Sequence, residues 1–118
     1  MSLLERARSR LSGLQDRAEA AELREEAAGA GCGPVTDQRI GDRVTVHGQL
    51  RTVTLRPRSG MCALEAELYD GSGSVTLVWL GRRRITGIDA GRSLTAHGRL
   101  GRRDGTTVIY NPRYELSR

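Results

Sequence analysis

Residues 64–79 read LEAELYDGSGSVTLVW, two alternating runs joined by a glycine-rich turn. Apolar residues occupy every second position from Leu64 to Leu68 and again from Val75 to Trp79. A half-buried strand needs this period, because successive side chains leave a strand on opposite faces. The intervening DGSG tolerates positive φ and hydrogen-bonds its own backbone, so the chain can reverse tightly there. The stretch therefore predicts the central hairpin of an all-β domain.

The composition fits one small domain with an appendage. The chain has 118 residues, 37% of them hydrophobic, and its four aromatic residues are Tyr69, Trp79, Tyr110 and Tyr114. Its core must therefore be mainly aliphatic. No stretch approaches the roughly 18 consecutive apolar residues of a membrane span, and the first residues lack the apolar region of a signal peptide. We expect a soluble, cytoplasmic protein with no membrane partner.

No pattern in the sequence indicates an enzyme or a metal centre. Cys32 and Cys62 form no CxxC pair, and with His47 and His97 they lack the spacing of zinc ligands. The serines have no G-x-S-x-G context, and the DGSG turn is not followed by the lysine of a phosphate loop. The acidic residues of the 64–79 stretch do not share one face, as a metal-dependent nuclease would require. We expect reduced structural cysteines, no cofactor, no metal and no catalytic site.

The charge is concentrated in the β part of the chain. All 19 basic residues are arginine, which together with abundant Ala and Gly is typical of a GC-rich bacterial genome. Residues 1–36 carry five arginines against six acidic residues, a net charge of −1, whereas residues 37–118 carry fourteen against eight, a net charge of +6. The positive field of the second segment could attract a polyanion.

An N-terminal helix is predicted for residues 3–28. Apolar residues with the 3-4 spacing of a helical seam occupy Leu4, Ala7, Leu11, Leu14, Ala18, Ala21 and Ala28. Two outcomes remain open: a helix docked on its own domain or on a partner, and a frayed helix that orders only in an oligomer. Glycines and Pro34 end the helix. The predicted organisation is a helix at 1–30, which could oligomerise or dock, a linker at 31–38 and a β domain at 39–118.

The β domain begins with a long, bent strand. After the linker, turn signals recur every eight to fifteen residues, the rhythm of a small barrel or sandwich. The first strand runs from Val44 through Leu55, and its apolar parity changes between Leu50 and Val53, which predicts a β-bulge. Arg56–Gly60 is predicted to be a loop by its composition.

Two further strands follow the hairpin. Arg82–Gly87 is too short for more than one helical turn, and a fourth strand is expected around Leu94–His97. Gly101–Gly105 is predicted to be a hairpin turn because it contains Asp-Gly. The last strand runs over Thr106–Tyr110, and Asn111–Pro112 ends it because proline has no N–H to donate.

In this order the segments resemble the OB-fold, a five-stranded Greek-key barrel, over residues 39–116. The motifs that carry the likeness are Gly41-x-x-Val44-x-Val46-x-Gly48, Leu68-x-Asp70-Gly-Ser-Gly73-x-Val75-x-Leu77-x-Trp79, Gly91-x-x-Leu94-x-Ala96-x-Gly98 and Tyr110-Asn-Pro112. They are similar to the wedge domain of branch-migration helicases and to anticodon-binding OB domains. The likeness is greater to small stand-alone OB-fold nucleic-acid-binding proteins of bacteria.

The resemblance implies a ligand lying across strands 2 and 3, between the loops that follow strands 1 and 4. The predicted nucleic-acid-binding residues are basic side chains of the loops and of the third-to-fourth connection, with one outward aromatic for base stacking: Arg56, Arg58, Tyr69, Arg82, Arg83, Arg84, Arg102 and Arg103. The alternative is that these arginines are only solvated surface. Trp79 is expected at the end of the core. Glu65 and Glu67 depart from the family's pattern, because they lie where a phosphate track would run.

The sequence therefore predicts a non-catalytic nucleic-acid-binding protein. Its expected partner is single-stranded or branched DNA, with RNA as the other candidate. The alternative is a protein-protein interaction module that uses the barrel or the N-terminal helix, in which case the arginines serve solubility.

Overall fold

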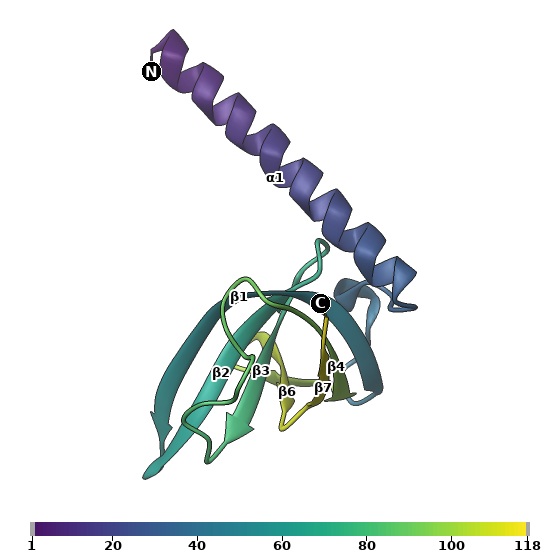
Figure 1. Cartoon of the computed structure of the whole chain (residues 1–118), viewed down its shortest axis with the longest axis vertical. Helices are drawn as coiled ribbons and strands as arrows, with labels where there is room; N and C mark the ends of the chain where they lie inside the picture. The colour runs from purple at the N-terminus through teal and green to yellow at the C-terminus, as the bar shows by residue number, and fades with distance from the viewer. Residues whose placement is uncertain (1, 118) are drawn as a thin grey trace.

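The computed structural model describes residues 2–117, except for the side chain of Arg58 (Figure 1). A long helix, α1, is followed by a short 3-10 turn at Val35–Asp37 and then by strands only. The helix spans Leu3–Gly29, and the strands are β1 Arg43–Arg58, β2 Met61–Tyr69, β3 Ser74–Leu80, β4 Ser93–Arg99, β5 Gly101–Arg103, β6 Thr106–Tyr110 and β7 Arg113–Leu116. The all-β class and the N-terminal helix are confirmed.

The strands form one sheet in the order β5-β6-β3-β2-β1-β4-β7. Neighbours are antiparallel except β3 and β6, which run parallel. The curved β1 pairs with β4 along its first half and with β2 along its second half, so it reaches across the domain (Figure 1). The register shifts between Leu50 and Thr52, which confirms the predicted bulge.

The sheet has seven strands where five were expected. The predicted fourth strand is present as β4 and ends at Arg99. The N–H of Leu100, the next residue, donates to the Asp42 carbonyl, and its own carbonyl accepts from the Gly41 N–H. The chain leaves β1 at this point and pairs with β6 as β5. The additional strand β7 lies against β4. The sheet order is open, so the closed five-stranded barrel stays a prediction.

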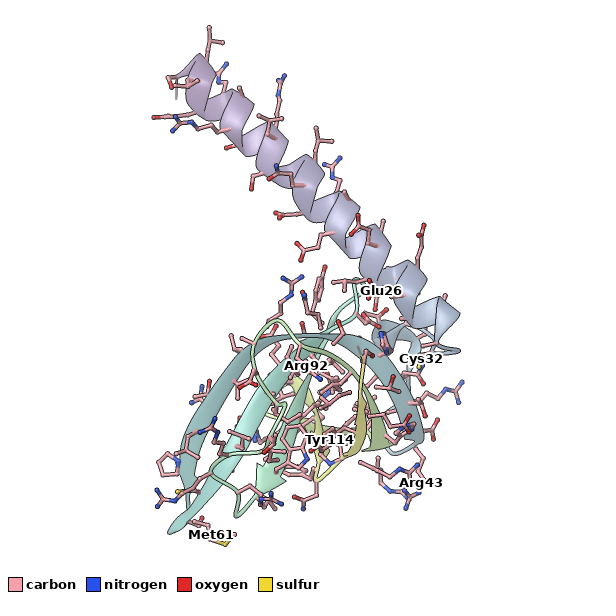
Figure 2. The ribbon with its side chains drawn as sticks, viewed as in Figure 1. Glu26, Cys32, Arg43, Met61, Arg92 and Tyr114 are labelled. Carbon is pink, nitrogen blue, oxygen red and sulfur yellow. The ribbon has the colours of Figure 1, made fainter. Side chains whose placement is uncertain are left out.

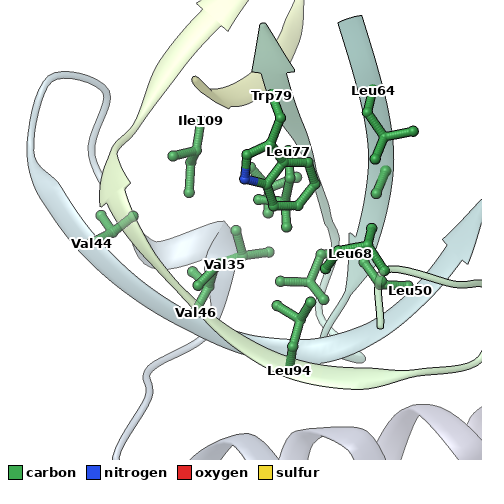
Figure 3. Close-up of a cluster of buried hydrophobic side chains, with 14 of the residues drawn as sticks. Val35, Val44, Val46, Leu50, Leu64, Leu68, Leu77, Trp79, Leu94 and Ile109 are labelled. Carbon is green, nitrogen blue, oxygen red and sulfur yellow. The ribbon is translucent and has the colours of Figure 1, made fainter. Parts of the chain in front are cut away.

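One aliphatic cluster fills the space enclosed by the curved sheet (Figure 3). Leu77, Leu94 and Ile109 are fully buried in it. Trp79 is 6% exposed, donates from Nε1 to the Pro112 carbonyl at 3.2 Å and meets the Tyr114 ring edge to face at 5.7 Å. The prediction that Trp79 packs in the core is confirmed. Burial of this apolar surface is the main favourable term of folding.

A buried carboxylate organises the β2–β3 turn. Asp70 Oδ1 accepts hydrogen bonds from the backbone N–H groups of Ser72 and Gly73, and Oδ2 accepts one from the Val35 N–H at 2.7 Å. Burial alone would raise the pKa of Asp70, but these hydrogen bonds and that of the Ser72 hydroxyl lower it below its ordinary value. Arg24 of α1 lies 3.6 Å from the same carboxylate. Asp70 therefore joins the turn, the segment before β1 and the helix.

The C-terminal end of α1 packs against the β domain, and its N-terminal half extends away from the sheet (Figure 1). Leu23 and Ala27 are its buried residues. The predicted seam does not make this contact, since Leu4, Leu11 and Leu14 are 63, 60 and 58% exposed. Within residues 2–117, no helix is both long and apolar enough to cross a membrane.

Candidate nucleic-acid interface

A hollow of about 280 Å³ lies on the outer side of the sheet, beside the β5–β6 turn. Ser59 and Gly60 both have positive φ in the β1–β2 turn, and Asp104 and Gly105 do in the β5–β6 turn, which suits two-residue hairpin turns. We call the hollow the outer groove; its lining residues come from β1, β2, β3 and the β5–β6 hairpin: Thr52, Thr54, Arg56, Glu65, Ala66, Glu67, Thr76, Arg103, Asp104 and Thr106.

Both segments predicted to be loops are shorter than expected. Arg56–Gly60 is not a loop throughout, because β1 continues through Arg58 and leaves only a two-residue turn. Pro57 is tolerated because β1 has only β2 as a neighbour here. Arg102 and Arg103 likewise lie on β5. The arginines therefore project from paired strands, which hold them more rigidly than loops would.

Glu65 of β2 joins an arginine of the neighbouring β1 to one of β5, which is distant in the sequence. Its carboxylate accepts hydrogen bonds from Arg103 at 3.0 and 3.4 Å and lies 3.8 Å from Nε of Arg56. Glu65 is only 6% exposed. Its hydrogen bond raises the pKa of Arg103, burial opposes this, and a hydrogen bond with Tyr110 adds to the rise. Glu65 therefore does not repel a ligand from the surface, but holds two arginines at the groove.

The outer groove is polar without being cationic. Arg56 and Arg103 are outnumbered by Glu65, Glu67 and Asp104, so the formal charge of its lining is −1. Four threonines supply hydroxyl groups that can donate and accept hydrogen bonds. Such a lining suits the edges of bases better than phosphates.

Tyr69 is linked to the helix through Arg51 of β1. The guanidinium of Arg51 lies 4.9 Å from the centre of its ring, and Arg51 in turn donates to Glu19 of α1 at 2.8 Å. A cation over the ring face contributes to docking of the helix. One face of the predicted stacking platform is thus occupied within the chain.

The other predicted residues do not line the outer groove. Arg82, Arg83 and Arg84 are exposed in the connection between β3 and β4. Arg102 is exposed and neighbours Arg103 on β5, where side chains alternate between faces. The side chain of Arg58 lies outside the described part of the structure. The structure thus brings together Arg56 and Arg103 among the predicted arginines.

A second hollow, of about 450 Å³, is lined by basic residues that were not predicted from the sequence. We call it the basic hollow; β1, β4 and the segment from the end of β6 to β7 line it with Arg43, Val44, Thr45, His97, Gly98, Arg99, Tyr110, Asn111 and Arg113. Tyr110 is 45% exposed and helps to raise the pKa of Arg103 of the outer groove. Its outward position follows from alternation with the buried Ile109. The arginines could be placed only with the strand register.

The histidines pair with threonines across β1 and β4. His47 Nδ1 lies 2.8 Å from the Thr95 hydroxyl, and His97 Nδ1 lies 3.1 Å from the Thr45 hydroxyl. His97 Nε2 also contacts Glu115 at 3.2 Å. No group of three or more His, Cys, Asp or Glu side chains in residues 2–117 is arranged to hold a metal ion.

Comparison with known proteins agrees with this architecture. RecG, in a structure bound to a three-way DNA junction, is similar with a TM-score of 0.59 and 24% sequence identity. The match covers 70% of this chain but only 12% of the RecG chain, so it supports the fold alone. No curated protein matches the sequence. The family model described as an OB-fold nucleic acid binding domain matches residues 44–117. The chain belongs to the family of OB-fold nucleic acid binding domains.

Proposed function

We propose that this protein is a non-catalytic, cytoplasmic DNA-binding protein whose ligand is single-stranded or branched DNA. The observation that carries the proposal is the outer groove, to which Glu65 holds Arg56 from β1 and Arg103 from β5. A ligand lying across β2 and β3 would pass between the two hairpin turns, as is usual in this fold. Unpaired nucleotides suit the groove because their base edges are free to meet its hydroxyl, guanidinium and carboxylate groups.

Fluorescence anisotropy with labelled single-stranded, duplex and forked DNA, and with single-stranded RNA, tests the proposal. We expect single-stranded and forked DNA to bind more tightly than duplex DNA, because a closed duplex hides the base edges. The double variant Thr54→Val with Thr76→Val removes two groove hydroxyls. If each hydroxyl loses a hydrogen bond of about 0.5–1.5 kcal/mol, the double variant should bind about tenfold more weakly. Absence of binding to every oligonucleotide at 50 mM salt would contradict the proposal.

We also propose a second role, in which α1 joins two copies of the chain. The exposed seam residues Leu4, Ala7, Leu11, Leu14, Ala18 and Ala21 form what we call the leucine face. Leu14 and the docked Leu23 are nine positions apart, which at 3.6 residues per turn places them about 180° apart around the helix. The leucine face therefore points away from the chain's own β domain. A helical segment of this length without tertiary support is marginal in water.

The charges beside the leucine face favour a second copy in parallel orientation. With Leu4 and Ala7 at heptad positions a and d, Arg17 occupies position g and Glu22 position e. In a parallel pair Arg17 of each helix would face Glu22 of the other, and both side chains are exposed. An antiparallel pair centred on Leu14 would instead place Arg10 against Arg17, which is repulsive.

Light scattering over a range of concentrations tests this second role. The measured mass should be that of a dimer of the 12.9 kDa chain, and the double variant Leu11→Glu with Leu14→Glu should have the mass of a monomer. Ser9→Glu with Ser12→Glu adds the same charge off the leucine face and should leave the dimer intact. A monomeric wild-type chain, or equal behaviour of the two variants, would overturn the self-association.

A cysteine variant tests the orientation. Leu4→Cys should form an interchain disulfide under mild oxidation, because equivalent residues meet only when the helices are parallel and in register. Ser9→Cys, on the outer side, is the control. A dimer in which Leu4→Cys does not cross-link would overturn the parallel arrangement.

A further inference from the structure

The basic hollow contains like charges that the chain itself does not neutralise. Arg43 of β1 and Arg99 of β4 are directly opposite each other in the antiparallel ladder. Like charges at opposed positions of a sheet are destabilising. Within residues 2–117, no carboxylate forms an ion pair with either arginine, and the Arg99 guanidinium donates instead to the Gly41 carbonyl. The fold therefore maintains a repulsive pair on one surface.

A third arginine joins this pair. Arg113 of β7 is the partner of His97 on β4 and lines the same hollow, again with no carboxylate partner in the described part of the chain. Glu115, on the same strand as Arg113, contacts His97 and is 72% exposed. Even with Glu115 included, the arginines leave a formal charge of +2, compared with −1 in the outer groove.

We propose that the basic hollow binds the phosphate backbone of the nucleic acid, while the outer groove receives bases. The inference rests on the proposed function. Guanidinium groups are the preferred donors to phosphate oxygens because their paired N–H groups match two oxygens at once. The side chain of Asn111 is oriented by its Oδ1, which accepts from the Leu80 N–H at 3.0 Å. Its amide nitrogen adds two N–H donors that have no partner among the described residues. A phosphate would satisfy these donors and relieve the repulsion between Arg43 and Arg99.

Tyr110 connects the two surfaces. Its side chain lines the basic hollow and lies close enough to Arg103, which lines the outer groove, to help raise the pKa of that guanidinium. A nucleotide chain can therefore pass from one to the other over an exposed aromatic ring, on which a base can stack. The backbone contact lies on β1, β4 and β7, away from the β2–β3 surface expected from the fold.

The experiment compares two double variants of equal charge. Arg43→Gln with Arg113→Gln removes two charges from the basic hollow, and Arg6→Gln with Arg92→Gln removes two exposed charges outside both surfaces. Binding of a dT20 oligonucleotide is measured by anisotropy from 50 to 300 mM salt. The first variant should bind about tenfold more weakly per lost arginine at 50 mM salt, and its slope of log K against log salt should fall by about 1.4. The control should retain the wild-type slope.

Inorganic polyphosphate separates this inference from the proposed function, because it carries no bases. Polyphosphate should raise the Tm of the wild type and of the Arg6/Arg92 control, since a ligand that binds only the folded state stabilises it. The Arg43/Arg113 variant should lose that shift. No shift in the wild type, or equal shifts and equal salt slopes in both variants, would overturn the phosphate site. DNA binding that survives either result would leave the proposed function standing.

Discussion

Glu65 shows how one residue can be misread from sequence. Its outward parity on β2 was correctly assigned, and a carboxylate at that position predicts repulsion of phosphates. In the structure Glu65 is buried and paired with Arg103, which lies 38 residues away in the sequence. Sequence parity specifies the face of a strand but not the cross-strand partners. The sequence therefore predicted that Arg56 and Arg103 could bind a ligand, but it did not predict that both would pair with Glu65.

Replacing Glu65 with Gln should lower both the stability of the fold and the affinity for DNA. The variant leaves Arg103 partly buried without a counter-charge, so the free energy of unfolding should fall by about 1–3 kcal/mol. Arg56 and Arg103 would lose the carboxylate that holds them at the groove, so DNA should also bind more weakly. Urea unfolding followed by Trp79 fluorescence and anisotropy measure the two effects. Glu67→Gln makes the same charge change at a less buried site; an equal loss of stability there would contradict the role assigned to Glu65.

Asp70 should make stability depend on acidity. Its folded-state pKa lies below the ordinary value of 3.8, so its contribution is fully present above pH 3.8 and is lost as the pH falls through the lowered pKa. Asp70→Asn should remove about 1–3 kcal/mol at pH 7 and flatten the decline in stability towards acid. Urea titrations from pH 7 to pH 2 measure this. Asp89→Asn, at an exposed turn residue, should keep the wild-type profile; an Asp70→Asn protein with that same profile would refute the prediction.

Among the elements, turns and the bulge were the most predictable. Asp-Gly at 104–105 forms the expected tight turn, and the parity change after Leu50 marks the bulge. Both are local signals that depend on backbone conformation. The break at Leu100 and the pairing of β7 were not predictable, because they depend on which strands lie next to each other. The same limit applies to Arg43, Arg99 and Arg113, which meet only through the register of β1, β4 and β7.

Gly71 should be required for docking of α1. It has φ of +91°, and a Cβ there would collide with the Ala20 carbonyl oxygen of the helix. Gly71→Ala should therefore cost about 1–3 kcal/mol from backbone strain, and it should also release the helix. Gly105→Ala is the matched control, because its φ is +78° and nothing lies within 4 Å of the added carbon. Trypsin should cut after the helix arginines faster in Gly71→Ala; equal rates in the two variants would count against this docking contact.

In the whole molecule, the sequence predicted most strands of the β domain and the bounds of the helix, but not how the helix packs on the domain. The helix was predicted within a residue at its end, and its apolar face was identified, because both follow from local pattern. The pattern did not reveal that Leu23 and Ala27 make the contact with the domain. Docking depends on the shape of the β2–β3 turn, which a helical periodicity does not encode.

Two copies joined through the leucine face should bind long DNA by both β domains. A long oligonucleotide should then bind at least about 100-fold more tightly than one that fills a single domain, because the second contact becomes intramolecular. The comparison uses dT60 and dT20 by anisotropy. Leu11→Glu with Leu14→Glu should abolish most of the difference, whereas Ser9→Glu with Ser12→Glu should not. A length effect that persists in the monomeric variant would argue against joint engagement.

The long strand β1 has one more consequence. It carries Arg43 at one end and Arg56 towards the other (Figure 2 labels Arg43 and, beyond the far end of β1, Met61). The spacing between the proposed phosphate site and the proposed base groove is thus set by a single strand, at most about 43 Å if it were straight and less because it curves. The shortest oligonucleotide that binds with full affinity should therefore have a fixed number of nucleotides, and this number should be the same at every ionic strength.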